Sequence, residues 1–380
     1  MTTIARLDRI PLHYELPEPF ANGQGFVGHR EYLLVRVVDS HGAVGYGECI
    51  GPVAGTDQIL ERIIGPALVG TAADTALSTL AGITASLRRR YKSYVPLGAV
   101  GGVELALWDL RGRSLGSPVG DLLGGRFHET VPAYVTGHYF TGGLSLDEQI
   151  DRILDEALGH VGRGFRRVKL KLGLEGVGHG RDADLRLLER VRAELPADVA
   201  LMADANCAYD LMQARRVAAC AQDLGYEWLE EPLDATDLDG YAALAADFRI
   251  PVSAGESWGD PAVFAAAIEK RSVDLLQPDI VAAGGLEPLR RISRLAASKG
   301  IASQPHVWGT SLAMAAGLQF LTSRAEAPLF EYDASPNPVR DSLLAGQLPV
   351  GADGRVAVPS GPGFGIEVPD EALERYRDRR

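Results

Sequence analysis

Two lysines stand two residues apart in a segment with the alternation of a β-strand, Arg167-Val168-Lys169-Leu170-Lys171-Leu172-Gly173. The chain has only five lysines against 33 arginines, so lysine here is a specific choice. Because side chains alternate across a strand, both amines share one face. Lysine can lose its proton, and two neighbouring ammonium groups lower each other's pKa. We therefore expect a general base in this pair; the alternative is a solvated edge strand with snorkelling lysines.

Three acidic residues, Asp204, Glu230 and Glu256, each end an aliphatic segment further along the chain. Oxygen ligands without a neighbouring thiolate or imidazole suit Mg²⁺ better than zinc. A single carboxylate at such a position is commonly a helix cap. Three at equivalent positions repel one another unless a cation lies between them. We predict a Mg²⁺ site and no further cofactor-binding residues.

Three more ionisable residues, Asp279, His306 and Glu331, end the last predicted strands. Asp279 and His306 follow adjacent strands, so the carboxylate can fix the imidazole tautomer and raise its basicity. Lys171 and His306 would lie on opposing sides of the strand ends, one base for each face of a substrate. Glu331 could be protonated by burial and donate a hydrogen bond to a developing oxyanion. The alternatives are a structural histidine and a surface carboxylate.

Eight short strands alternating with helices are needed to bring these residues together. Aliphatic or β-branched segments begin near residues 131, 167, 199, 226, 251, 273, 301 and 329, with helical patterns such as 183–195, 211–224 and 261–270 between them. This alternation predicts a parallel α/β sheet closed into a barrel, whose site lies at the carboxyl ends of the strands.

A different pattern precedes the barrel. Residues 1 to about 60 have the pattern of strands and turns, with a hairpin-like turn at 39–43, and residues 103–112 have a helical pattern. We predict an α+β domain over residues 1–126, the barrel over 127–335, and a C-terminal segment over 336–380 that returns a strand and loop to the first domain.

Composition limits the class of partner. The 380 residues carry a formal net charge of −12, which argues against nucleic acid or an anionic membrane. The sequence shows no signal-peptide pattern and no apolar stretch of about 18 residues. Three scattered cysteines suit free thiols in a reducing compartment. We expect a cytoplasmic homo-oligomer that binds a small-molecule carboxylate.

In their order and spacing these residues resemble the enolase superfamily, and within it the mandelate racemase subgroup. The matching segments are Lys169-Leu170-Lys171, Asp204-Ala205-Asn206, Glu230-Glu231-Pro232, Gly255-Glu256, Pro278-Asp279, Pro305-His306 and Glu331, and outside the barrel 45–48, 106–112, 122–125 and 361–365. The resemblance implies a (β/α)7β modified TIM barrel with an N-terminal α+β capping domain completed by the C-terminal tail.

The resemblance also implies roles. It implies abstraction of the proton α to a carboxylate, giving an enediolate, with Lys171 and the Asp279–His306 dyad as bases and Lys169 neutralising the carboxylate. Segments 20–26 and 50–56 would form the lid. Asn206, His138 and Trp308 are substrate-binding candidates, and a core role is equally open for His138 and Trp308. The muconate-cycloisomerase and dipeptide-epimerase branch carries a lysine at the end of the sixth strand, where this chain has Asp279. The chain therefore looks unlike that branch.

Residues 305–310 look most similar to those of galactarolactone cycloisomerase and acid-sugar dehydratases. We therefore predict a lyase that dehydrates an aldonate or aldarate to a keto-deoxy acid. The alternatives within the subgroup are a cycloisomerase of an aldarolactone and a racemase or epimerase of a hydroxy acid. From other classes we weigh a Schiff-base aldolase using Lys171, a nucleotide site at the glycines of 176–180, which lack the full dinucleotide fingerprint, and a non-catalytic binding protein.

Overall fold

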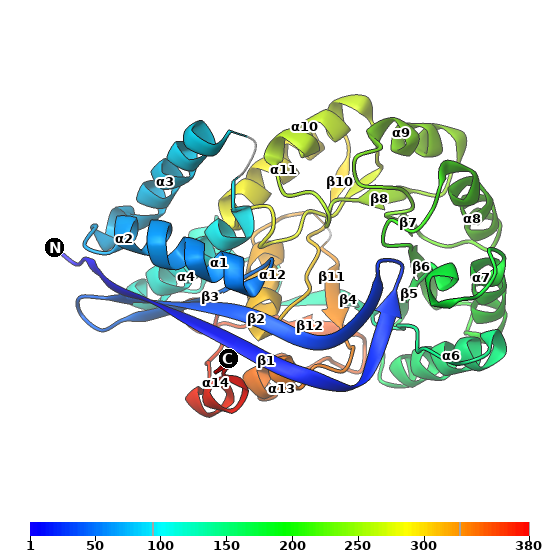
Figure 1. Ribbon diagram of the computed structural model, residues 1–380, viewed down its shortest axis with the longest axis horizontal. Coiled ribbons are helices and arrows are strands. Elements are labelled where there is room, and N and C mark those ends of the chain that lie inside the picture. The colour runs from blue at the N-terminus through cyan, green and yellow to red at the C-terminus, as the bar shows by residue number, and fades with distance from the viewer. Residues whose placement is uncertain (93–94, 327, 380) are drawn as a thin grey trace.

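Eight parallel strands form the larger part of the molecule in the computed structural model, which describes residues 1–92, 95–326 and 328–379 (Figure 1). Neighbours along the chain pair with each other from β4 to β10, and β11 pairs with β4. The strands are β4 (Thr130–Thr136), β5 (Arg167–Lys171), β6 (Ala200–Asp204), β7 (Leu229–Glu230), β8 (Val252–Ala254), β9 (Leu275–Leu276), β10 (Ala302–Ser303) and β11 (Phe330–Asp333).

A helix connects each strand to the next and covers the outside of the sheet (Figure 1). These helices are α6 (Leu146–Gly162), α7 (Ala183–Glu194), α8 (Leu211–Asp223), α9 (Leu238–Asp247), α10 (Pro261–Lys270), α11 (Leu286–Ser298) and α12 (Ser311–Thr322). Seven helices between eight strands confirm the predicted (β/α)7β order. Since all eight strands run the same way, their carboxyl ends meet at one rim.

Local signals in the sequence start several of these helices. Ser145 and Glu148 form a reciprocal capping box at the start of α6, which satisfies two backbone donors at once. Asp210 and Asp260 cap α8 and α10 through their side chains. Thr310 caps α12 in the same way, so the loop that follows β10 ends at a defined point.

The first part of the chain is a three-stranded antiparallel sheet with helices beside it. Its strands are β1 (Ile4–Asn22), β2 (Gly25–Asp39) and β3 (Val44–Cys49), and the predicted turn at 39–43 joins the last two. The helices are α1 (Val53–Ile59), the π-helix η1 (Leu60–Ile64), α2 (Gly65–Leu68), the 3-10 helix η2 (Ala73–Thr75), α3 (Ala76–Tyr91), α4 (Leu97–Leu115) and α5 (Val119–Leu122).

The β1–β2 hairpin extends from this sheet to the rim of the barrel (Figure 1). Its turn contains Gly23, where an added Cβ would lie 2.2 Å from the carbonyl oxygen of Ala205, just beyond β6. A Cβ on Gly173, just beyond β5, would lie 2.7 Å from the Cα of Gly23. The absence of side chains at both positions therefore lets the hairpin lie against the strand ends.

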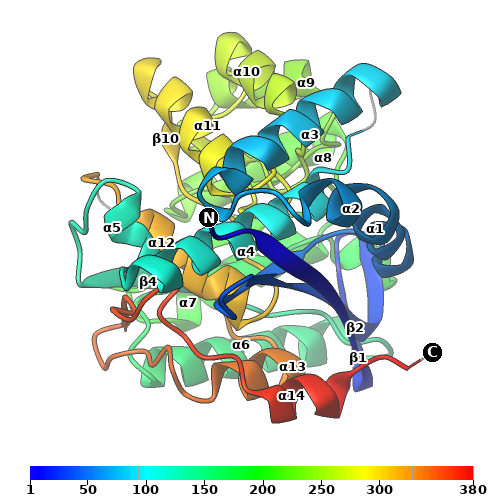
Figure 2. The same ribbon diagram turned by 90° about the vertical axis from the view of Figure 1, so that its left-hand side faces the viewer.

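The C-terminal segment contains α13 (Pro338–Leu344), β12 (Arg355–Ala357) and α14 (Asp370–Tyr376). β12 pairs with the barrel strand β4, not with the first domain as expected, because β5 and β11 occupy only the later residues of β4. The loop at 361–365 does reach the first domain, where Phe364 N donates to Asp109 Oδ1 at 2.7 Å. Figure 2 shows α14 beside β1.

The 3-10 helix η3 (Leu174–Val177) and the turns after it contain the glycines at 176–180. No helix within the described ranges is long and apolar enough to cross a membrane.

Candidate active site

Lys169 and Lys171 belong to β5, which is not an edge strand because it has β4 on one side and β6 on the other. Both side chains are buried. Lys169 Nζ lies 2.6 Å from Glu230 Oε1 and 2.7 Å from Glu331 Oε1, and Lys171 Nζ lies 2.5 Å from Asp204 Oδ2. The alternative of a solvated edge strand is therefore wrong.

The expected lowering of a lysine pKa is not found. Burial disfavours the ammonium form of Lys171, but Asp204 and the other neighbouring acidic groups together outweigh it and raise the pKa. Burial likewise opposes the charge on Lys169, and Glu230 and Glu331 raise its pKa. The repulsion between the two like charges is a smaller effect on the pKa of Lys171 than the attraction of Asp204, which only the assembled barrel brings to the amine.

Asp204, Glu230 and Glu256 form one cluster, in which a carboxylate oxygen of each lies within 4.8 Å of the others. Trp228 Nε1 and Gln277 Nε2 donate to Glu230 Oε2 at 3.0 and 2.8 Å. Each carboxylate comes from the end of a successive strand, or from the loop directly after it.

The cluster has the donor chemistry of a site for a hard divalent cation. Its three carboxylates offer only oxygen atoms, and Glu331 adds a fourth carboxylate beside the two ammonium groups. Burial and the neighbouring acids raise the pKa of Glu230 and of Glu256. Burial also opposes ionisation of Asp204, but Lys171 and Lys169 together outweigh it and lower the pKa. A cation would offset the excess negative charge, and these residues fit Mg²⁺.

His306 and Asp279 form the hydrogen-bonded pair that the sequence predicts. His306 Nδ1 lies 2.8 Å from Asp279 Oδ2, and Asp279 Oδ1 accepts from Val281 N and Ala282 N at 2.8 and 2.6 Å. The carboxylate can only accept, so it holds the proton on Nδ1 and leaves Nε2 as the working nitrogen.

The other ring nitrogen of His306 faces the carboxylate cluster, with Nε2 3.0 Å from Glu256 Oε2. Burial opposes the imidazolium form, but Glu256 and Glu331 raise the pKa to about 10. Lys171 contacts Asp204 and His306 contacts Glu256. The two candidate bases therefore lie on either side of the cluster.

Glu331 is a carboxylate that accepts hydrogen bonds, which corrects the expectation of a protonated donor. Burial alone would raise its pKa, but Lys169 and His306 lower it. Its Oε1 pairs with Lys169, and its Oε2 accepts from Val307 N at 3.2 Å. Glu331 thus fixes both Lys169 and the loop that carries His306.

The three substrate-binding candidates lie in different surroundings. Asn206 Nδ2 donates to Glu256 Oε1 at 3.0 Å, so it lies at the cluster. Trp308 packs on the barrel rim, 6.4 Å from Tyr32 between ring centroids. His138 is fully buried; its Nδ1 lies 2.9 Å from the Lys169 carbonyl and its ring 5.3 Å from that of His160 in α6.

Two residues that position the site were not assigned a role from the sequence. Gln277 holds Glu230, and its place two residues before Asp279 is a strand-alternation signal that could have been used. Glu48, at the end of β3, accepts from Thr310 N at 2.9 Å and from Thr310 Oγ1 at 2.6 Å. This contact spans 262 residues of sequence, and no local pattern predicts it.

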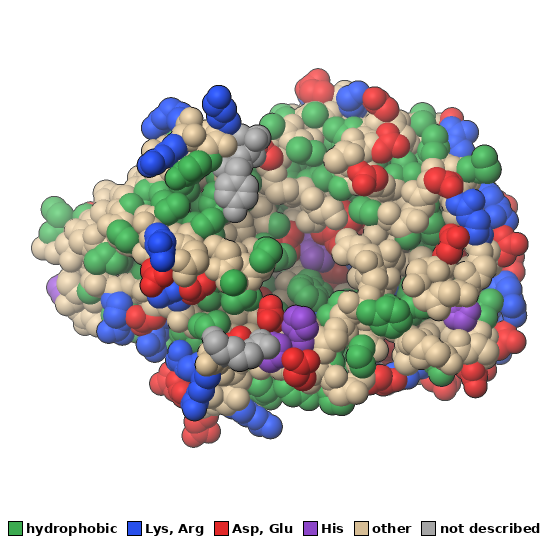
Figure 3. Space-filling view, in the orientation of Figure 1, with side chains coloured by type: hydrophobic (Ala, Val, Ile, Leu, Met, Phe, Trp, Pro, Cys, Tyr) green, Lys and Arg blue, Asp and Glu red, His purple; other side chains and the backbone are tan. Residues whose placement is uncertain are grey.

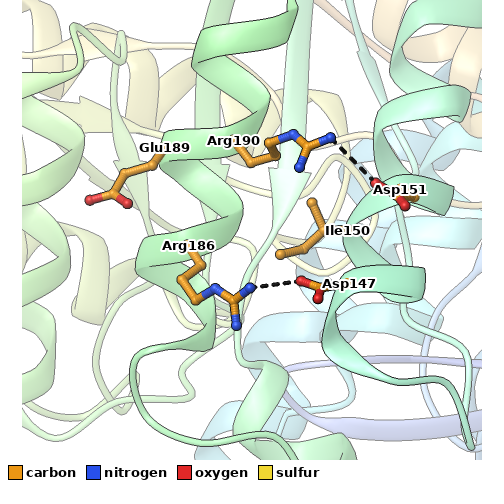
Figure 4. A pocket seen from close by; sticks show the side chains of 6 residues that line it. All are labelled: Asp147, Ile150, Asp151, Arg186, Glu189 and Arg190. Atoms are coloured by element: carbon orange, nitrogen blue, oxygen red, sulfur yellow. Dashed lines mark hydrogen bonds and ion pairs between the residues drawn. The ribbon is translucent and has the colours of Figure 1, made fainter.

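Figure 3 shows the molecule in the orientation of Figure 1, with a hollow over the barrel. A histidine and acidic side chains are visible inside this hollow. A second hollow lies between α6 and α7 on the outside of the barrel (Figure 4). Exposed pairs line it, with Arg186 2.7 Å from Asp147 and Arg190 3.7 Å from Asp151. Because those charges are exposed on the outside of the barrel, this hollow lacks the buried, converging ionic groups of the first one.

Fold and site together define a capped barrel in which three carboxylates that could hold a cation lie near two candidate bases. The family described as "Enolase C-terminal domain-like" matches residues 152–372, and "Mandelate racemase / muconate lactonizing enzyme, N-terminal domain" matches residues 9–124. The chain therefore belongs to the mandelate racemase and muconate lactonizing enzyme family of the enolase superfamily.

Individual relatives cover nearly the whole chain. The D-galactarolactone cycloisomerase of Agrobacterium fabrum is 33% identical over 377 residues, 96% of each chain. The 3,6-anhydro-D-galactonate cycloisomerase of Zobellia galactanivorans is 30% identical, with a TM-score of 0.87 over 99% of this chain and 100% of that one. The L-talarate dehydratase of Polaromonas sp. JS666, complexed with Mg and L-glucarate, is 26% identical, with a TM-score of 0.82 over 100% and 98%.

Proposed function

We propose that this enzyme removes the proton α to the carboxylate of an acid sugar and eliminates the β-hydroxyl as water, giving a keto-deoxy acid. The observation that carries the proposal is the cluster of Asp204, Glu230 and Glu256 with Lys171 at one side and His306 at the other. Removing a proton beside a carboxylate develops a second negative charge, so it needs concentrated positive charge at the substrate oxygens.

Asp204, Glu230 and Glu256 would hold Mg²⁺ in this scheme. When bound, the ion supplies the positive charge that the substrate carboxylate needs as its α-carbon loses the proton. Lys169, kept in place by Glu331 at 2.7 Å, adds a second positive charge at the same end. Asn206 and Trp308 remain candidates for substrate contact.

The two bases divide the proton transfers between them. A cation at Asp204 would take up the charge that stabilises the ammonium form of Lys171 and so lower its pKa. The neutral Lys171 Nζ then takes the α-proton on one face, and His306 Nε2 delivers a proton to the departing β-hydroxyl, so that one water leaves. Asp279 keeps the imidazole oriented for this step through its bond to Nδ1. The enol that remains becomes the keto-deoxy acid when its β-carbon, which lost the hydroxyl, takes up a proton and the enol hydroxyl gives one up.

A cycloisomerase acting on an aldarolactone is the second candidate. The specific observation in its favour is the 33% identity to a D-galactarolactone cycloisomerase over 96% of both chains. The same two bases would remove the α-proton and expel the ring oxygen of the lactone instead of a hydroxyl. A racemase or epimerase would need the same bases on both faces and no leaving group.

A substrate screen tests the proposal. The enzyme with Mg²⁺ is incubated with a panel of sugar mono- and diacids and their lactones, with α-keto acid formation measured and lactone opening followed by NMR in D₂O. We expect keto acid from at least one acid, with deuterium at the carbon that lost the hydroxyl, and deuterium at the α-carbon of any acid that exchanges without elimination. Absence of both product and deuterium exchange across the panel would contradict it.

A further inference from the structure

A second group of metal-ligating side chains lies apart from the carboxylate cluster. It consists of His138, Glu156 and His160, and one ligand atom of each lies within 4.8 Å of the others. Glu156 and His160 stand four residues apart in α6, so they share one face of that helix. His138 comes from the loop directly after β4. The group therefore joins a barrel strand to the helix that follows it.

The Nε2 atom of His138 is a buried acceptor without a donor. The side chain is fully buried, and its Nδ1 lies 2.9 Å from the carbonyl oxygen of Lys169. A carbonyl can only accept, so the ring proton is on Nδ1 and Nε2 carries a lone pair. Nε2 has no hydrogen-bond partner among the described residues. Burial lowers the pKa of His138, so the ring is neutral at pH 7, as a metal ligand must be.

Glu156 and His160 face the same point from α6. The Nε2 atom of His160 is buried, has no hydrogen-bond partner in the described part of the chain, and lies 3.5 Å from Glu156 Oε1. Glu156 Oε1 also accepts from the backbone N–H of His138 at 3.2 Å. Burial opposes ionisation of Glu156, but its contacts with the two histidines outweigh burial and lower its pKa to about 2. Two imidazole nitrogens and an anionic oxygen thus converge.

We propose that His138, Glu156 and His160 bind a zinc ion, which fastens α6 to the ends of β4 and β5. Two imidazoles and one carboxylate are a zinc ligand set, with water in the fourth position. The carbonyl of Lys169 is the kind of outer partner that orients a metal-bound imidazole through its other nitrogen. The site differs in chemistry from the carboxylate cluster, whose ligands are all oxygen atoms and suit Mg²⁺.

The distances allow this ion with small movements of the side chains. Ligand atoms about 2.1 Å from a tetrahedral zinc ion lie about 3.4 Å from one another, and His160 Nε2 and Glu156 Oε1 are already 3.5 Å apart. The Glu156 side chain is 33% exposed, which gives the ion a path from solvent. His160 Nδ1 lies 3.4 Å from Nη1 of the exposed Arg163. An ion at Nε2 would move the ring proton to Nδ1 and end only this long contact.

The test measures zinc binding in Glu256→Gln, which lacks one ligand of the carboxylate cluster, so its result does not depend on the proposed function. The protein is stripped with a chelator and titrated with Zn²⁺ by calorimetry. We expect one ion per chain, a Tm higher by at least about 2 °C, and the strong visible absorption of tetrahedral Co²⁺ when cobalt replaces zinc. His160→Gln and Glu156→Gln should each weaken zinc binding more than about a hundredfold, since loss of an outer partner alone costs up to that.

The matched control is His13→Gln. His13, Glu31 and Asp378 form the other histidine-containing group of this kind in the described chain, and we expect the variant to keep the zinc affinity and the cobalt spectrum. Zinc binding that is lost in His13→Gln but kept in His160→Gln would overturn the proposal. Absence of a bound ion from the folded Glu256→Gln protein, with an unchanged Tm, would overturn it too, and that result needs no change at the three ligands.

Discussion

At the scale of single residues, the chemistry of this chain depends on ionic contacts that each use more than one partner. Lys169 contacts both Glu230 and Glu331, and His306 contacts both Asp279 and Glu256. The types and order of these residues were predictable because each one ends a strand. Their charge states were not, because the pKa of Lys171 and of Glu331 depends on neighbours from other strands.

Replacing each base separately should abolish a different step of the reaction. In His306→Asn, keto acid formation should fall by on the order of 10²- to 10⁴-fold, while Lys171 continues to exchange the α-proton with D₂O. Lys171→Met should lose that exchange. Exchange is followed by ¹H NMR beside product formation. Equal loss of exchange in both variants would contradict the assignment of one base to each face.

At the scale of elements, the first domain holds the loop that carries His306. Glu48 at the end of β3 accepts from the backbone and hydroxyl of Thr310, four residues after His306. A Cβ on Gly309 would lie 2.4 Å from Glu48 Oε1, so the loop lies directly against that carboxylate. The strands and most helices were predictable from periodicity, but this contact between domains has no local signal.

Replacement of Glu48 should therefore affect stability and turnover together. Glu48→Ala leaves two buried donors of Thr310 without an acceptor, which should lower the free energy of unfolding by about 1–3 kcal/mol. We also expect a lower kcat, since the loop carrying His306 loses its anchor. Glu48→Gln keeps an acceptor oxygen and should lose less of both. Urea unfolding and steady-state kinetics measure the two effects; wild-type behaviour of Glu48→Ala would be contrary evidence.

At the scale of the whole molecule, three segments that are distant in sequence pack against the barrel or the first domain. The β1–β2 hairpin reaches the strand ends, β12 pairs with β4, and α14 lies beside β1. The alternation of strand and helix predicted the barrel. It did not predict where β12 pairs, because a free strand edge is created only when the fold is assembled. The domain boundaries at 126 and 335 and the homo-oligomer remain predictions.

Glu104 joins the two large parts of the molecule and should make stability depend on pH. It belongs to α4, and its carboxyl group accepts from Leu286 N at 2.8 Å and Glu287 N at 3.0 Å in α11. Burial outweighs these hydrogen bonds and raises the pKa of Glu104 from 4.5 to about 7. The folded state thus binds a proton more tightly than the unfolded state does.

The sign of this effect follows from proton binding. The contribution of Glu104 is complete below pH 4.5 and is lost as pH rises to about 7. Across that window the stability of the wild type relative to Glu104→Gln should fall by on the order of 3 kcal/mol. Urea unfolding of both proteins at several pH values gives the difference. A difference that is constant or rises with pH would show that the carboxyl group is ionised throughout.

The central claim is that proton abstraction depends on a cation held by Asp204, Glu230 and Glu256. The most direct measurement is the rate of deuterium incorporation at the α-carbon of a substrate acid as Mg²⁺ is added back to metal-stripped enzyme. We predict no exchange without metal, a saturable rise with Mg²⁺, and loss of that rise in Glu256→Gln but not in the exposed control Asp147→Asn. Full exchange in metal-free buffer containing EDTA would contradict the account.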